Sequence, residues 1–232
     1  MQNNICILCT RPLKERLVQE ALQEGISIDE MSFIETEAVQ SIEVQQEIEQ
    51  AAKKIATVVF TSMNAVEAVA DYLDGQTVEW RIYCMGTTTN QLVKKYFGEH
   101  QLAGTANSAA ELAELIAENI MIDEVTFFCG DQRRDELPKI LCSYNIDVTE
   151  IIVYQTIAVS HTINKIYHGI LFFSPSAAES FFRKNKLSDT TILFAIGSTT
   201  AAEIKKYSSN KIIISDQPGK ENLVAKMMEY FT

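Results

Sequence analysis

The sequence predicts an α/β protein made of two similar domains, each a parallel sheet covered by helices on both faces. Three observations lead to this prediction. Short apolar segments of strand length alternate with amphipathic segments of helix length. Small polar residues follow most of the apolar segments, as they do where a strand turns into a helix. The two halves of the chain also resemble each other weakly, which is typical of a duplicated architecture.

The apolar segments predict the strands. Each is a short run rich in Ile, Val and Phe, bounded by polar or small residues. The predicted strands cover residues 4–9, 28–34, 56–61, 80–85, 124–129, 148–154, 169–173, 191–196 and 211–215. Residues 100–103 offer a further, less regular strand.

Helices are predicted between the strands, because apolar residues recur there every three or four positions. They cover residues 12–24, 41–54, 64–73, 88–97, 108–120, 133–143, 176–186, 199–207 and 220–231. The Glu- and Gln-rich segment 36–54 fits either a helix or a connector. Strands that alternate with helices in this way favour parallel pairing, since each crossover is long enough to return to the same edge.

An internal repeat supports two domains. Residues 59–67 align with residues 171–179 at an offset of 112, with Phe, Ser, Ala and Glu at matching positions. Residues 86–89 align with residues 197–200 at an offset of 111, with Gly and two Thr in common. The nearly constant offset indicates that the same strand–helix units occur twice.

A third match has the reverse chain order and sets the domain boundaries. Residues 129–137 match residues 9–17, at the very start of the chain. The N-terminus therefore completes the sheet of the C-terminal half, and two crossings favour a hinge with a ligand cleft between the domains. We expect a discontinuous first domain (1–36 plus 157–232), an inserted second domain (37–156), and hinge crossings near 36–40 and 154–158.

Composition and charge exclude several classes of protein. The chain has 20 Lys and Arg against 31 Asp and Glu, a net charge of −11, which argues against nucleic-acid binding. No apolar run approaches the ~20 residues of a membrane helix. The N-terminus lacks the basic and apolar regions of a signal peptide. We therefore expect a cytoplasmic protein that binds neither nucleic acid nor membrane.

The charge divides unequally between the expected domains. The first holds 12 basic and 12 acidic residues, and the second 8 basic and 19 acidic. The whole excess of negative charge therefore belongs to the inserted domain.

The five cysteines suggest neither a disulfide framework nor a metal site. Cys6 and Cys9 form a CxxC, which would suit a redox pair or half a metal site. In a strand, however, residues three apart point to opposite faces, so buried strand residues explain the pair better. Cys84, Cys129 and Cys142 are predicted to be small buried side chains.

The turns after the strands are the candidate binding site. In open parallel sheets, ligands bind beyond the carboxyl ends of the strands, where helix N-termini present free N–H groups. Here the turns carry many hydroxyls, several glycines and few fixed charges, which suits an anionic ligand. Helix capping explains any single Ser or Thr better than ligand contact does. The runs Thr87–Thr89 and Ser198–Thr200 exceed what capping requires.

Three further residues each allow two interpretations. Arg133, next to Arg134, is either a ligand clamp or part of an exposed charge pair, and Arg11 at a strand end offers the same choice. Tyr154 ends a strand at a domain crossing, so it either packs there or places a phenol in the cleft as a proton donor.

No GxGxxG, GxxxxGK[ST] or GxSxG motif is present, so dinucleotide, P-loop and hydrolase-triad chemistry are not indicated.

Six segments, taken together and in order, resemble uroporphyrinogen-III synthases. They are residues 60–66, 104–109, 130–137, 153–156, 172–177 and 195–201, and the resemblance runs from about residue 5 to about residue 230. It implies two flavodoxin-like domains joined by a β-ladder linker, with the site in the cleft. The chain departs from the pattern at Met63 and Ser198, where many members have proline.

The resemblance implies a cofactor-free enzyme of tetrapyrrole biosynthesis. Such enzymes close linear hydroxymethylbilane to uroporphyrinogen III, with loss of water and inversion of the last pyrrole ring. Tyr154 would assist departure of the hydroxyl as water, and the turns at Ser62, Thr89, Ser174 and Thr200 would hold substrate carboxylates. With the turn residues above, the candidate substrate-binding set is Arg11, Ser62, Asn64, Ala65, Gly86, Thr88, Thr89, Gly130, Arg133, Ser174, Ser176, Ala177, Gly197, Thr199 and Thr200, with no metal.

Two alternatives come from other classes. One is a hinge-type, non-catalytic binding protein for a small anion, against which the missing export signal argues. The other is a two-domain nucleotide-sugar transferase, for which no diphosphate-binding signature is present. The family resemblance further favours a monomer and allows a transient contact with the preceding enzyme of the pathway.

Overall fold

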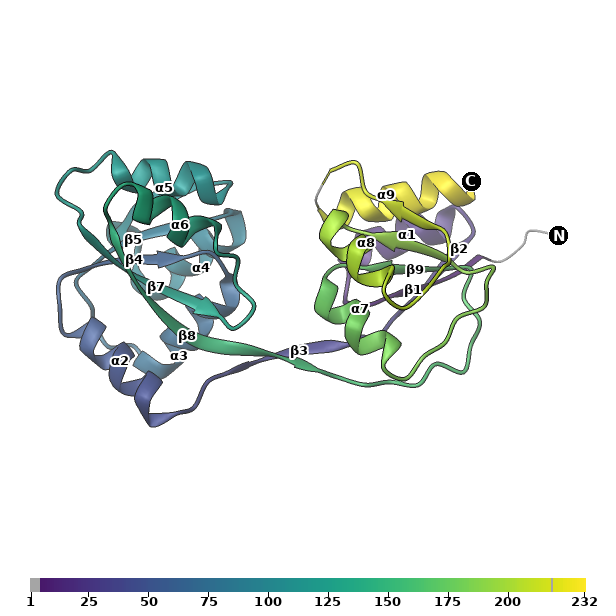
Figure 1. The fold of residues 1–232 in the computed structure, drawn as a ribbon, viewed down its shortest axis with the longest axis horizontal. Helices are drawn as coiled ribbons and strands as arrows, with labels where there is room; N and C mark the ends of the chain where they lie inside the picture. Colours follow the sequence, from purple (N-terminus) through teal and green to yellow (C-terminus); the bar gives the residue numbers. More distant parts are fainter. Residues whose placement is uncertain (1–4, 218) are drawn as a thin grey trace. The chain divides into compact units, whose positions relative to one another are not determined.

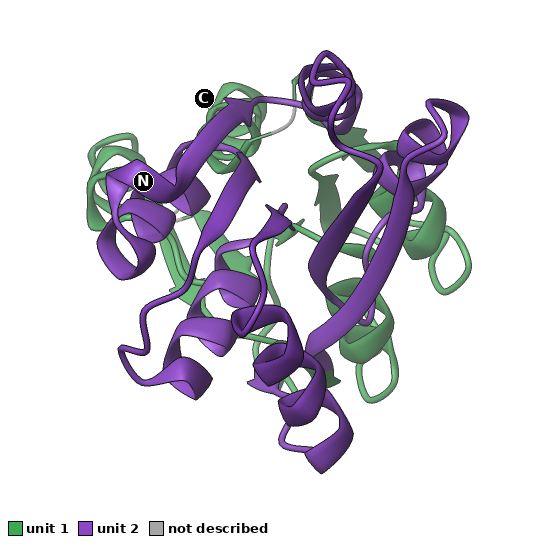
Figure 2. Cartoon of the chain, turned by 90° about the vertical axis from the view of Figure 1, so that its left-hand side faces the viewer, with its two compact units in different colours: residues 1–35, 157–232 green, residues 36–156 purple. Residues whose placement is uncertain are grey.

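The computed structural model describes residues 5–217 and 219–232. The chain divides into two compact units, each with its own sheet and core (Figures 1 and 2). Unit 1 combines the N-terminal residues up to Glu35 with Ile157–Thr232, and unit 2 is Thr36–Thr156.

Unit 1 is a five-stranded parallel sheet. Its strands lie in the order β11 (Ile212–Ile214), β10 (Ile192–Ala195), β9 (Gly169–Phe172), β1 (Ile5–Cys9) and β2 (Ile26–Glu30). Each neighbouring pair is parallel. Counted along the chain, this is the 2-1-3-4-5 order of flavodoxin-like folds, with the switch point between β1 and β9.

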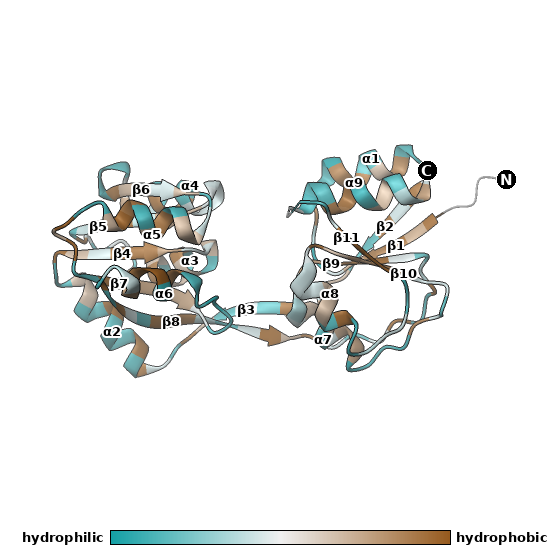
Figure 3. Ribbon diagram, turned by 45° about the horizontal axis from the view of Figure 1, so that its top comes forward, coloured by the Kyte–Doolittle hydropathy of each residue, from teal (hydrophilic) through white to brown (hydrophobic). Residues whose placement is uncertain are grey.

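Helices cover both faces of this sheet. They are α1 (Glu15–Gln23), α7 (Pro175–Phe182), α8 (Ser198–Ile204) and α9 (Lys220–Phe231). Successive residues of β1 alternate between the two cores, since Ile7 and Cys9 pack with α1 and α9 while Leu8 packs with α7 and α8. Figure 3 shows the resulting contrast between apolar central strands and hydrophilic outer helix faces.

Unit 2 contains a six-stranded sheet. Its strands lie in the order β3 (Ile34–Ala38), β8 (Asp147–Ala158), β7 (Glu124–Gly130), β4 (Ala56–Phe60), β5 (Trp80–Met85) and β6 (Leu102–Ala106). The pairs from β8 to β6 are parallel. Helices α2 (Ile42–Ala52), α3 (Met63–Leu73) and α4 (Thr87–Phe97) pack on one face, and α5 (Ala109–Ala117) and α6 (Glu136–Ser143) on the other.

The two sheets are circular permutations of each other. In unit 2 the strands lie in the order β8-β7-β4-β5-β6, and in unit 1 the equivalent positions hold β2-β1-β9-β10-β11. The first two positions are filled by the last two strands of unit 2 but by the first two strands of unit 1. Three of these five pairs, β4 with β9, β5 with β10 and β7 with β1, are the ones that the internal repeat aligns in the sequence. The predicted α/β fold with parallel sheets is therefore confirmed.

The predicted elements differ from the structure in two regions. The strand expected over 100–103 begins only at Leu102, because Glu99–Gln101 form a short 3₁₀ helix. The strand expected over 28–34 is two strands, because the chain leaves the sheet of unit 1 after Glu30. Phe33 separates them, fully buried, with its ring 5.1 Å from that of Phe181. The segment 36–54 begins in the exposed strand β3 and continues as helix α2, so it contains both a connector and a helix.

The predicted placement of the cysteines is confirmed at four positions and wrong at one. Cys6 and Cys9 pack in opposite cores, as the strand period requires. Cys84 and Cys129 are buried, but the prediction for Cys142 was wrong, because this residue lies on the exposed face of α6, whose buried positions are Leu137 and Leu141. Among the described residues, no His, Cys, Asp and Glu side chains cluster as metal ligands, and no helix has the length and apolar character to cross a membrane.

Candidate active site

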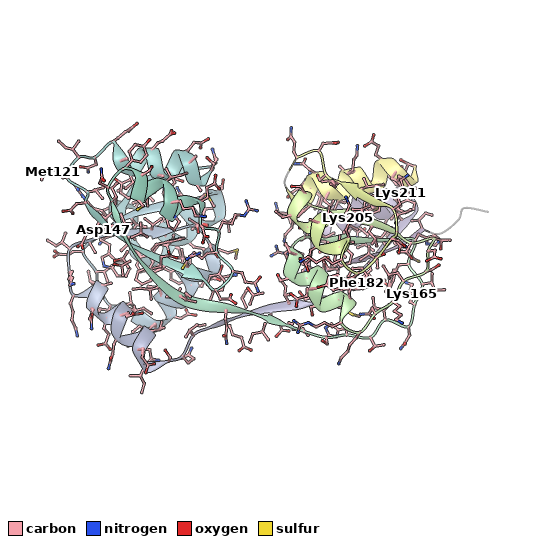
Figure 4. The ribbon with its side chains drawn as sticks, in the orientation of Figure 1. Met121, Asp147, Lys165, Phe182, Lys205 and Lys211 are labelled. Carbon is pink, nitrogen blue, oxygen red and sulfur yellow. The ribbon has the colours of Figure 1, made fainter. Side chains whose placement is uncertain are left out.

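The carboxyl ends of the strands in unit 2 surround a pocket of about 370 Å³. Its lining comes from the turns after β4, β6 and β7 and from β8, and includes Ser62, Ser108, Gly130, Arg134 and Tyr154. The strands β4 and β7 are neighbours whose crossovers run in opposite directions, so the pocket occupies the topological switch point of the sheet. Asp147 and Met121, labelled in Figure 4, mark the opposite edge, where β8 and β7 begin.

Tyr154 and Ser62 are joined by a hydrogen bond within this pocket. The phenol of Tyr154 donates to Oγ of Ser62 at 3.0 Å. Ser62 is the N-cap of α3 and accepts the N–H of Asn64 at 3.2 Å. The phenol is half-buried and held at the positive end of an eleven-residue helix, where a developing negative charge on its oxygen is favoured. This arrangement suits a proton donor to a group bound in the pocket.

Gly130 provides the space that the ring of Tyr154 occupies. A register shift between Cys129 and Gly130 pairs Gly130 with Tyr154. A Cβ atom at position 130 would lie 2.7 Å from Oη of Tyr154, well inside van der Waals contact. The N–H of the next residue, Asp131, donates to the carbonyl of Tyr154 at 3.1 Å. The sequence analysis predicted a substrate contact at Gly130, and that remains a prediction. What the structure shows is that Gly130 accommodates the phenol.

The two arginines of the pocket differ in their partners. Arg133 forms ion pairs with Glu150 and Asp135, and it holds the pKa of Asp135 below its usual range. Arg134 is exposed and has no ion pair or hydrogen bond with another residue in the described part of the chain. Because the charge of Arg133 is already compensated, Arg134 is the cation available to an anionic ligand.

The other residues predicted for unit 2 lie outside the large pocket. Asn64 borders a smaller pocket of about 160 Å³, together with Tyr154 and the carboxylates of Glu37, Glu67 and Asp71, which would repel an anion. Ala65 is buried in the core. The three predicted residues that follow β5 line neither pocket; they are Gly86, Thr88, which is exposed, and Thr89, which is buried.

Sequence reasoning missed Asn107 and Ser108, which follow β6 and line the large pocket. Ser108 is the N-cap of α5 and accepts the N–H of Glu111 at 3.2 Å. The strand before it was the least regular in the sequence, so this turn was not among the candidate binding turns, although residues 104–109 were one of the six segments of the family resemblance. The small polar run Thr105–Ser108 was the available signal.

The residues predicted for unit 1 occupy the carboxyl edge of its own sheet. Ser174 is the N-cap of α7 and accepts the N–H of Ala177 at 3.1 Å, with Oγ of Ser176 3.2 Å away. Gly197 occupies the N-cap of α8. The remaining members of the set are Thr199 (exposed), Thr200 and Ala177 (both buried) and Arg11 (exposed in the turn after β1).

The internal repeat relates these turns to those of unit 2. Ser174 and Ser62, which the repeat aligns, each accept a backbone N–H at the start of a helix. Gly197 and Gly86, also aligned, occupy the N-caps of α8 and α4. Gly86 has φ +85°, a conformation that favours glycine.

Comparison with known proteins identifies one family. The family model described as "Uroporphyrinogen-III synthase HemD" matches residues 15–225. A curated relative from Saccharomyces cerevisiae, "Uroporphyrinogen-III synthase", is 23% identical over 169 residues, a match that spans 62% of this chain and 62% of the relative. The chain thus spans about three-fifths of the length of this relative.

Two solved structures share the fold. The uroporphyrinogen-III synthetase of Helicobacter pylori matches with a TM-score of 0.69 and 15% identity, over 97% of this chain and 99% of that one. A mutant uroporphyrinogen III synthase from the extremely thermophilic bacterium Thermus thermophilus matches with a TM-score of 0.60 and 11% identity, over 98% of each chain. At these identities the matches establish the fold.

Proposed function

The chain belongs to the uroporphyrinogen-III synthase family, and on this basis we propose that it cyclises linear hydroxymethylbilane to uroporphyrinogen III. The observation that carries the proposal is the family match over residues 15–225, which includes the whole pocket of unit 2. The reaction expels the terminal hydroxyl as water and closes the ring with the last pyrrole inverted. The pocket offers what the first step requires, a positioned proton donor next to a helix N-terminus and an uncompensated cation.

Tyr154 acts as the proton donor in this proposal. The phenol transfers its proton to the terminal hydroxyl as the C–O bond breaks, so that water leaves and an azafulvene cation forms beside the phenolate. Ring closure at the inverted pyrrole releases one proton from carbon, which returns the phenolate to the phenol. When substrate binds, the phenol turns its only O–H from Oγ of Ser62 toward the terminal hydroxyl. The O–H of Ser62 then donates to the phenolate oxygen, next to the helix N-terminus of α3.

The rest of the rate enhancement comes from holding a flexible chain in the ring-closing shape. The acetate and propionate groups of the substrate bind at the strand-end turns of each unit, through helix N-termini and hydroxyls. Unit 1 holds 12 basic and 12 acidic residues, whereas unit 2 holds 8 and 19. Net charge therefore opposes binding to unit 2, and local donors must provide the recognition.

The identity of the product tests the function. Purified protein is incubated with freshly prepared hydroxymethylbilane, the product is oxidised, and the isomer is identified by chromatography. We expect the type III isomer, while the reaction without protein gives the type I isomer by spontaneous closure. Type I alone in both reactions would reject the proposal. Tight binding without turnover would instead support the anion-binding alternative.

Arg134 is expected to contribute to substrate affinity through its charge. Arg134→Gln should raise KM about 1.4- to fivefold at low ionic strength with little change in kcat, because an exposed cation–carboxylate pair contributes roughly 0.2–1 kcal/mol. Lys139→Gln is the matched control, since it removes the same charge from α6 without touching the pocket. Equal KM values in the two variants would show that Arg134 acts only through net charge.

Ser62→Ala is expected to have a modest effect. It removes an N-cap, which costs about 0.5–2 kcal/mol of stability, and the hydrogen-bond partner of Tyr154. The rate of ring closure should fall less than about tenfold, because the phenol remains in place. Ser41→Ala is the control, since Ser41 caps α2 outside the pocket. Complete loss of activity in Ser62→Ala, with a loss of stability no larger than that of Ser41→Ala, would identify Ser62 as a direct acid or base.

We further propose that the chain acts as a cytoplasmic monomer. We also propose that the N-terminal turns of α4, α7 and α8 contact the substrate, and that Arg133, which lines the pocket although its charge is compensated, does so too. These proposals rest on the family resemblance and on the position of the turns at the carboxyl edges of the sheets. Size-exclusion chromatography with light scattering tests the oligomeric state, and a dimer at micromolar concentration would contradict it.

A further inference from the structure

The turn after β1 in unit 1 has a fixed backbone and an exposed arginine. The N–H and the hydroxyl of Thr10 both donate to the carbonyl of Leu171, at 3.1 and 2.8 Å. The thiol of Cys9 donates to the carbonyl of Arg11 at 2.8 Å. The two bonds of Thr10 attach the turn to β9, and the bond of Cys9 fixes the backbone within the turn. Arg11 is therefore held, exposed, at the switch point of this sheet.

A second cation reaches the same turn from the other end of the unit's sequence. Lys220 is the first residue of α9, and its ammonium donates to the carbonyl of Pro12, the neighbour of Arg11, at 3.2 Å. The side chain of Lys220 is half-buried. Burial, and next the charge of Arg11, lower the pKa of Lys220. The two positive charges are therefore close enough to destabilise each other.

The carboxylates around this pair have other partners. Glu30 accepts the N–H of Leu13 at 2.6 Å, and Glu221 forms an ion pair with Lys14 at 3.0 Å. Neither Arg11 nor Lys220 forms an ion pair with any residue in 5–217 or 219–232. A partly desolvated ammonium with one carbonyl partner and a repelling neighbour is an unfavourable arrangement, which a bound anion would relieve.

We propose that Arg11 and Lys220 form a carboxylate-binding subsite that holds one acetate or propionate group of the substrate. The proposal rests on the proposed function, and it adds Lys220 to the contacts predicted from sequence. Two donors of different shape at one turn suit a carboxylate. The guanidinium can donate to both carboxylate oxygens, or it can donate to one oxygen while the ammonium donates to the other. The location also fits the balanced charge of unit 1, whose net charge does not oppose a substrate with several carboxylates.

Steady-state kinetics with hydroxymethylbilane provide the first test. Arg11→Gln and Lys220→Gln should each raise KM about three- to tenfold, and kcat should stay within about twofold of wild type. Lys226→Gln is the matched control, because it removes a charge from the same helix at a residue paired with Asp216 and Glu229. An unchanged KM in both Arg11→Gln and Lys220→Gln would overturn the proposal.

The titration of Lys220 provides a second test that does not depend on turnover. The lysines are dimethylated with ¹³C, which keeps their charge, and the Lys220 signal is assigned from its absence in Lys220→Gln. Citrate, as a simple polycarboxylate, should raise the pKa of Lys220 in the wild type and less so in Arg11→Gln. A pKa that citrate does not move would show that the pair has only a structural role. If the wild type fails to form the type III isomer but citrate moves this pKa, the function fails and the anion subsite stands.

Discussion

Tyr154→Phe is expected to slow ring closure by about 10²- to 10⁴-fold, the range that a positioned general acid contributes. The substitution removes one oxygen atom and the 3.0 Å bond to Ser62, and the ring keeps its place against Gly130. Substrate affinity and the thermal unfolding midpoint should stay close to wild type. The measurement is single-turnover formation of the type III isomer, since it separates chemistry from binding and product release.

Tyr72→Phe is the matched control for this experiment. It also removes a phenol from unit 2, whose hydrogen bond goes to Glu49 at 2.8 Å, outside the pocket. Its rate should equal that of the wild type. If Tyr154→Phe also closes the ring at the wild-type rate, Tyr154 has no part in the mechanism, and the hydroxyl leaves without help from this side chain.

Gly130→Ala is expected to lower both stability and activity. The new methyl group would meet the ring of Tyr154, with Oη 2.7 Å away, so the ring must move. Overpacking of this kind costs about 1–3 kcal/mol. Displacement of the phenol from Ser62 should lower the rate at least about tenfold, because proton transfer depends on the position of the donor. Thermal unfolding and single-turnover kinetics measure the two effects.

A double-variant cycle tests the cause. When Tyr154 is already replaced by Ala, the space beside position 130 is free, and Gly130→Ala should then cost little or no stability. An equal loss of stability in both backgrounds would show that the backbone at Gly130, and not the ring of Tyr154, determines the cost.

The sequence predicted the parts of the site that follow from local pattern. Ser62 and Ser174 were identified because each follows an apolar strand and precedes a helix, and the structure makes both of them N-caps. The repeat likewise paired β4 with β9, and these strands have equivalent places in the two sheets. Periodicity and turn chemistry are short-range signals, so a single sequence contains them.

The remaining features depend on which strands are neighbours. The sequence could not decide whether Arg133 is a ligand clamp or part of an exposed charge pair. Its partner Glu150 lies on β8 and comes close to it only because β7 pairs with β8. The same pairing, with its register shift, places Gly130 against Tyr154. Lys220 contacts the turn after β1 from a helix 208 residues away. None of these contacts follows from local sequence.

The circular permutation of the two sheets has a consequence for the order of folding during synthesis. Unit 2 is one continuous stretch, so all the strands of its sheet have been synthesised once the ribosome has passed Ala158. In unit 1, β1 pairs with β9, and the bond from Thr10 to Leu171 spans 161 residues. At roughly 5–20 residues per second, β1 therefore waits on the order of ten to thirty seconds for its neighbour. During that interval β1 lacks its neighbour β9, so its apolar residues Ile7 and Leu8, which are fully buried in the folded unit, stay outside their native core.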